Sequence, residues 1–247
     1  MKRKNFLKSL LILPFAGHAM KLNELTKITE SFGSTEKMPV IFVGHGNPMN
    51  AITINKYSKS WAEMGKKLPM PKAILCVSAH WLTNGTAVTV SAKPKTIHDF
   101  GGFPDELFQV QYPAPGSPEL SRLTMSEIHS IKVHEDLEWG LDHGAWSVLK
   151  HLYPLANVPV FQLSIDYNKS PQYHFNLGKE LRELRRKGVL IMGSGNIVHN
   201  LGMVSWGNSE KKYDWAIEFD SFVKKNIEEN NSQALVDYQK LGQLATL

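Results

Sequence analysis

Three of the ten histidines in this chain follow apolar, strand-like runs that break at small residues. His45 stands in a glycine turn after the first run, His80 ends the second, and His199 follows the glycine-rich turn of the third. The three segments are Val40–Gly46, Ala73–Trp81 and Val189–His199. Open α/β sheets bind their ligands beyond the carboxyl ends of the strands, so we expect these histidines at one edge of a sheet.

Neutral imidazole is the commonest side-chain ligand for metals, so three converging histidines are candidates for a metal site. They lie much farther apart in the sequence than the ligands of a compact zinc motif, and the spacing alone leaves metal-binding and structural roles equally open. Three nitrogen donors with an open position would suit catalysis, because a structural zinc site fills all four positions with protein ligands.

The elements that position these residues alternate between strand and helix along the chain. This alternation predicts a three-layer α/β sandwich with a mostly parallel central sheet and helices on both faces. Further strands are expected over Ala87–Ser91 and Val158–Ile165. Helices are expected over Tyr57–Lys67, Pro118–Ile128, a segment beginning near Asp142 and His143, Ser170–Lys187 with Gly188 closing it, and Asp214–Glu229.

We expect residues 38–247 to form one domain, preceded by a signal-like segment and polar tether over residues 1–37. Met1–Met20 has a basic start and an apolar stretch too short to span a bilayer, which is typical of an export signal. The alternative is an amphipathic N-terminal helix on a cytoplasmic protein. Neither alternative predicts stable insertion into a membrane.

The charge distribution argues against a nucleic-acid-binding protein, and the cysteine content excludes an intramolecular disulfide. Four of the 28 basic residues lie in the first twenty positions, which contain no acidic residue, and the remaining chain, with its 23 acidic residues, is close to neutral. A nucleic-acid-binding surface is therefore not expected. Cys76 is the only cysteine, which rules out an intramolecular disulfide, and its apolar run predicts a buried thiol.

Seven short motifs, in the same order along the chain, resemble the class III extradiol ring-cleavage dioxygenases, in particular the branch similar to DOPA 4,5-dioxygenase. The resemblance runs from about Met38 to Leu247. It implies a non-haem metal, Fe(II) for activity with Zn(II) as a possible occupant, and two substrates, a small aromatic diol and dioxygen. The motifs are Gly44–Met49, Ser78–Trp81, His98–Pro104, Tyr112–Pro118, Asp142–Trp146, Gln162–Asp166 and Gly193–Asn200.

The resemblance also implies roles for individual residues. His45 and His80 match ligand histidines of the metal, and His199 matches a histidine that is a ligand in this branch and a catalytic base in related enzymes. His143, in the Asp-His-Gly motif, is expected to act as the acid in ring cleavage. This branch has a further ligand histidine just after the segment that matches Gly242–Leu247, so the resemblance implies a chain that is truncated there or has lost its last ligand.

Two other classes remain open at this stage. A zinc-dependent hydrolase would use the same histidines to activate water, and would need a nearby Glu as base. A non-catalytic metal-binding relative would explain a missing ligand. The aromatic side chains of Trp81, Phe100 and Phe103 can stack on a substrate ring or pack in the core.

Overall fold

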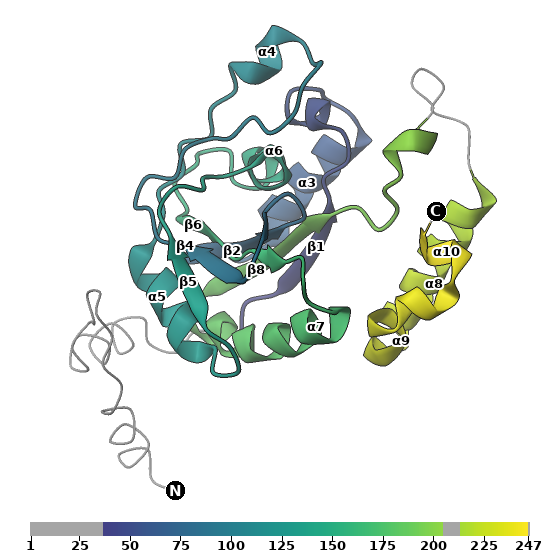
Figure 1. The fold of residues 1–247 in the computed structure, drawn as a ribbon. Helices are drawn as coiled ribbons and strands as arrows, with labels where there is room; N and C mark the ends of the chain where they lie inside the picture. Colours follow the sequence, from purple (N-terminus) through teal and green to yellow (C-terminus); the bar gives the residue numbers. More distant parts are fainter. Residues whose placement is uncertain (1–36, 205–212, 247) are drawn as a thin grey trace, which may run out of the picture. The chain divides into compact units, whose positions relative to one another are not determined.

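In the computed structural model, which describes residues 37–204 and 213–246, a parallel sheet of four strands lies at the centre (Figure 1). The strands are β1 (Val40–Gly44), β2 (Ala73–Ser78), β6 (Val160–Gln162) and β8 (Val189–Gly195), in the order β1-β8-β2-β6. Each neighbouring pair is parallel, so all four carboxyl ends share one edge. The predicted parallel sheet is confirmed, and its carboxyl edge leads to the segments that carry the three histidines.

One face of the sheet packs on helix α6 (His143–Leu152), and α6 in turn packs on α3 (Lys56–Lys67). Ile74 and Cys76 alternate along β2 on the α6 side and belong to the same buried cluster as Trp146. Gly65 of α3 permits this close approach, because a Cβ there would lie 2.2 Å from the carbonyl oxygen of Leu152. The packing fixes the N-terminal end of α6 over the sheet edge.

Helices α5 (Pro118–Glu127) and α7 (Pro171–Glu180) lie on the opposite side of the sheet from α3 and α6 (Figure 1), so both faces are covered as predicted. Their buried residues include Leu123 and Leu177, which lie outside the α6 cluster. The helix expected up to Lys187 ends its α-helical part at Glu180 and continues as the 3₁₀ helix η2 (Leu181–Lys187). Gly188 closes it at φ 85°, as expected of a left-handed cap.

Two small parallel pairs extend the fold beside the main sheet. The strand expected over Val158–Ile165 is interrupted after β6 and resumes as β7 (Ile165–Asp166), which pairs with β3 (Leu82–Thr83). The strand expected over Ala87–Ser91 is β4 (Thr86–Thr89). Its partner β5 (Val133–Asp136) was not predicted, because that segment is short and mostly polar.

Short helices fill the connections, and a helical segment follows residue 213. Among the described residues, no helix is long and apolar enough to cross a membrane. The signal-like segment lies outside the described residues, so its role and its boundary stay predictions. The remaining helices are η1 (Pro48–Ala51), α4 (Asp105–Phe108), η3 (Leu201–Met203), α8 (Asp214–Glu228), α9 (Ser232–Val236), η4 (Tyr238–Leu241) and α10 (Gln243–Thr246).

Candidate active site

His45 lies in the turn after β1 and is buried, with only 2% of its surface exposed. Its Nδ1 is 3.0 Å from Oγ of Ser194 on β8, and the Ser194 hydroxyl donates its hydrogen to the carbonyl of Gly144. A hydroxyl has a single hydrogen, so Ser194 must accept from His45. The hydrogen bond therefore assigns the His45 proton to Nδ1 and leaves a lone pair on Nε2.

His80 lies two residues beyond the end of β2. Its Nδ1 is 3.1 Å from Oδ2 of Asp99, and its backbone N–H donates to Oγ of Ser78 at 3.2 Å. The Ser78 hydroxyl in turn donates to Oδ1 of Asp142 at 2.6 Å. These bonds fix both the backbone and the ring of His80.

His143 is the first residue of α6 and follows Asp142, whose side chain caps the helix by accepting from the backbone N–H of Ala145. Both the Nδ1 and the backbone N–H of His143 lie close to Oδ1 of Asp99, at 3.0 and 2.8 Å. Asp99 thus contacts two histidines from different elements, one through each carboxylate oxygen.

The carboxylate of Asp99 determines the tautomers of both rings. Burial by itself would raise the pKa of Asp99, but the hydrogen bonds from His143 and His80 outweigh burial and hold this pKa well below its usual range. An ionised carboxylate can only accept hydrogen bonds, so both Nδ1 atoms carry hydrogens. In the neutral rings, both Nε2 atoms then carry lone pairs.

The three histidines form a compact cluster in which one ligand atom from each ring lies within 4.8 Å of the others. Nε2 of His45 and Nε2 of His80 are 3.1 Å apart. In neutral rings the two lone pairs would repel at this distance unless a proton or a metal ion lies between them, and two imidazoles that bind one metal at about 2.0–2.1 Å bring their nitrogens to roughly this separation. The donor set therefore fits a metal ion.

The electrostatic surroundings differ between the two facing rings. Burial, followed by the charges of His80, His143 and His199, lowers the pKa of His45 to about 3. Burial also acts to lower the pKa of His80, but the hydrogen bond and the charge of Asp99 outweigh it and raise this pKa. His45 is therefore neutral and ready to donate its lone pair at any physiological pH.

His199 is the predicted site residue that lies outside this cluster. It is exposed in the loop after β8, yet close enough to His45 for its charge to lower the pKa of that ring. It lines a cavity of about 520 Å³ together with residues that include Trp215 and Phe219 of α8. The structure brings together His45, His80 and His143, whereas the role of His199 as ligand or base stays a prediction.

The three aromatic side chains proposed to stack on a substrate ring lie in different surroundings. Trp81 is 3% exposed and stacks on Trp139 at 5.9 Å, so it packs in the interior. Phe100 meets His143 edge-on at 5.5 Å and Phe103 at 5.4 Å. Phe100 is thus the aromatic side chain of these three that borders the histidine cluster.

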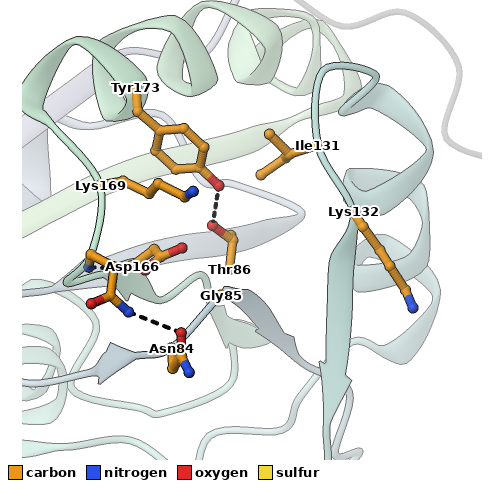
Figure 2. Close-up of a pocket in the computed structure, with 9 residues that line it drawn as sticks. Asn84, Gly85, Thr86, Ile131, Lys132, Asp166, Lys169 and Tyr173 are labelled. Carbon is orange, nitrogen blue, oxygen red and sulfur yellow. Dashed lines mark hydrogen bonds between the residues drawn. The ribbon is translucent and has the colours of Figure 1, made fainter.

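A second cavity, of about 400 Å³, is lined by nine residues, none of which belongs to the histidine cluster (Figure 2). Two pairs of its polar side chains bond to each other, with Tyr173 Oη 2.8 Å from Thr86 Oγ1 and Asn168 Nδ2 2.9 Å from Asn84 Oδ1. The side chain of Lys132 points away from these pairs (Figure 2). This cavity is therefore lined by a different set of residues from the histidine cluster. The lining residues are Asn84, Gly85, Thr86, Ile131, Lys132, Asp166, Asn168, Lys169 and Tyr173.

Sequence reasoning missed the residues that orient the rings, namely Asp99, Ser194 and the cap Asp142 in its link to Ser78. Asp99 follows His98 within the motif His98–Pro104, and an acidic residue inside one of the seven motifs was the available signal. The two serines had no signal of their own, because serine at the end of a strand is ordinary.

Comparison with known proteins shows the family to which this chain belongs. Residues 38–244 match the family described as the catalytic LigB subunit of aromatic ring-opening dioxygenase, and the chain belongs to this family. It is an extradiol ring-cleaving dioxygenase and therefore an oxidoreductase. Family membership favours this class over the zinc-dependent hydrolase and the non-catalytic relative.

Several relatives share most of the chain. A protein of Escherichia coli K12 named 4,5-DOPA dioxygenase extradiol is 48% identical over 195 residues, which cover 78% of this chain and 72% of the relative. A protein of Beta vulgaris with the same name is 40% identical over 210 residues, covering 80% and 76%. The crystal structure of an uncharacterized E. coli K12 protein matches with a TM-score of 0.70 and 42% identity, covering 82% of this chain and 79% of that one.

Proposed function

We propose that this enzyme opens the ring of a DOPA-like catechol, with dioxygen as second substrate and Fe(II) as the metal. The names of the relatives support the substrate class. The observation that carries the metal is the pair of Nε2 atoms of His45 and His80, 3.1 Å apart with both Nδ1 atoms already committed as donors. Such a pair is an incomplete ligand set that a cation would complete.

Fe(II) suits this donor set because histidine sites with open positions are typical of non-haem iron oxygenases. When bound, the metal supplies Lewis acidity toward the catechol oxygens and a place where dioxygen can be activated. Zinc binds the same nitrogens but has no redox chemistry, so it would occupy the site without supporting oxygenation.

The residues of the chain have separate tasks in this proposal. His45 and His80 bind the metal, and Ser194 and Asp99 hold their rings in the binding orientation. His143 is buried beside them with its Nδ1–H held by Asp99, so its Nε2 is placed to give a proton to the ring-opening intermediate when the imidazole is charged.

The exposed His199 is proposed as a further ligand or as the base that takes a catechol proton. Histidine suits the second task because a neutral imidazole can accept a proton from a bound catechol. Metal affinity and the pH profile of turnover, compared between His199→Gln and the parent enzyme, separate the two roles. Loss of metal indicates a ligand, while retained metal with loss of the acidic limb of the pH profile indicates a base, because a base is inactive when it is protonated at low pH.

The function is tested with anaerobically Fe(II)-loaded enzyme, L-DOPA and other ortho-diols, followed by oxygen uptake and product mass. We expect one dioxygen consumed per substrate and a ring-opened product that has gained both oxygen atoms. A meta-diol cannot chelate through adjacent oxygens and serves as the matched negative substrate. Iron-loaded enzyme that consumes no oxygen with any ortho-diol would refute the proposal.

A further inference from the structure

We propose that Asp99 is a positioning residue that sets the tautomers of His80 and His143 together, so that one carboxylate aims both Nε2 atoms into the site. The inference rests on the proposed function only for what those Nε2 atoms bind. The tautomers themselves are properties of the metal-free chain and are measurable without any substrate.

The loop that carries Asp99 is anchored immediately before this residue. Ile97 N–H donates to the carbonyl of Leu141 at 2.7 Å, and the indole N–H of Trp146 donates to the carbonyl of Ile97 at 2.8 Å. Nε2 of His98 also lies 2.9 Å from the carbonyl of Val110. Asp99 is thus held at a fixed position beside the N-terminal end of α6.

The acceptor capacity of Asp99 is divided between the two rings. Oδ1 accepts from the backbone N–H and the Nδ1–H of His143, and Oδ2 accepts from the Nδ1–H of His80. The bond to the backbone N–H also places a negative charge at the helix N-terminus, where the helix dipole favours it. The carboxylate therefore joins a turn beyond β2, the start of α6 and its own loop.

His45 provides an internal reference, because its tautomer is set by Ser194 and not by Asp99. A change confined to Asp99 should leave the His45 tautomer unchanged. A general disturbance of the fold would affect all three rings alike.

The decisive substitution is Asp99→Asn, which keeps the shape but replaces one acceptor oxygen by an NH₂ donor. The amide oxygen can still satisfy one imidazole, but the NH₂ group opposes the Nδ1–H of the other. That ring relieves the conflict by carrying its proton on Nε2, where it points into the site and blocks the lone pair. One of the two rings, His80 or His143, therefore changes tautomer.

The test is long-range ¹H–¹⁵N NMR of the metal-free, histidine-labelled protein in alkaline buffer, where the imidazoles are neutral. In the parent protein we expect Nδ1–H on His45, His80 and His143. In Asp99→Asn we expect Nε2–H on His80 or on His143, with His45 unchanged. The matched control is Asp136→Asn, because Asp136 accepts from the backbone N–H groups of Glu138 and Trp139, and we expect no change in the three rings.

Metal affinity gives a second readout, with Co(II) as the probe and its visible spectrum as the signal. Loss of a residue that orients a ligand typically costs 10- to 100-fold in affinity, and we expect a loss of this size in Asp99→Asn but not in Asp136→Asn. Unchanged tautomers in Asp99→Asn overturn the inference. If that variant does not fold, Nε2–H on His80 or His143 of the parent protein overturns it equally.

The NMR result and the oxygen-uptake result are separable. Switched tautomers in a protein that opens no catechol would uphold the role of Asp99 and refute the proposed function. Ring opening by a parent enzyme whose tautomers do not depend on Asp99 would support the proposed function and refute the role of Asp99.

Discussion

The substitution Gly144→Ala tests whether the start of α6 is as tightly fitted to the sheet edge as the distances indicate. In an open helix this change stabilises, since alanine is favoured over glycine by about 1 kcal/mol. Here the new Cβ would lie 2.5 Å from Oγ of Ser78 and 2.9 Å from Cδ2 of His80. We therefore expect the steric conflict to dominate and the sign to reverse.

The magnitude follows from what must move. Ser78 is fully buried and its hydroxyl donates to Asp142 at 2.6 Å, so turning the hydroxyl away leaves buried polar groups unpaired at about 1–3 kcal/mol. Shifting the backbone instead resembles overpacking, which costs a similar 1–3 kcal/mol. After the helix gain of about 1 kcal/mol, the free energy of unfolding should fall by about 0–2 kcal/mol. Each kcal/mol lowers Tm by roughly 2–4 °C in a domain of this size.

The matched control is Gly178→Ala in α7, where a new Cβ would meet no described atom within 4 Å. Urea and thermal melts of the metal-free proteins should show Gly178→Ala unchanged or slightly more stable, and Gly144→Ala less stable. Anaerobic Fe(II) titration should show weaker binding in Gly144→Ala alone, because His80 is displaced. If both variants gain stability to the same extent, the inference that Gly144 is tightly packed against Ser78 and His80 is refuted.

Three further outcomes are expected. His45→Ala and His80→Ala should each abolish Fe(II) binding with an unchanged circular dichroism spectrum, because both side chains lie beyond their strands, and undiminished iron in either variant removes that residue from the site. Ser194→Ala should weaken Fe(II) binding about 10- to 100-fold. The control Ser147→Ala removes a buried hydroxyl without a partner among the described residues and should leave Fe(II) binding unchanged. Equal affinities in the two variants would contradict the role of Ser194. Cys76 should resist thiol reagents until the protein unfolds, because burial and then the charge of Asp142 raise its thiol pKa; modification of the folded protein would show that β2 opens.

The sequence allowed the main elements to be predicted because their signals are local. The apolar runs ending at Gly44, Ser78 and Gly195 are the parallel strands β1, β2 and β8, and the Gly188 cap ends η2 as expected. β5 was not predicted because its mostly polar residues do not favour a strand. Its extended conformation depends on pairing with β4, which is a non-local contact.

The candidate site was predicted in part for a similar reason. His45 and His80 could be identified from the strands that end beside them, and His143 from its motif. That His143 joins them within one cluster depends on the packing of α6 against the sheet, which no local pattern specifies. The contacts of Asp99 with His80 and His143 could not be predicted, because they connect segments that are distant in the sequence.

The register of the central sheet explains how so few residues can orient the cluster. Ser194 of β8 is aligned with Ser78 of β2 on one side and with Val43 of β1 on the other. The hydroxyls of Ser78 and Ser194 both reach the start of α6, through Asp142 and the carbonyl of Gly144. A slip of one residue in either strand would turn its serine to the opposite face. The orientation of the histidines is therefore built into the pairing of β2 with β8, because paired strands and not loops hold the two serines in place.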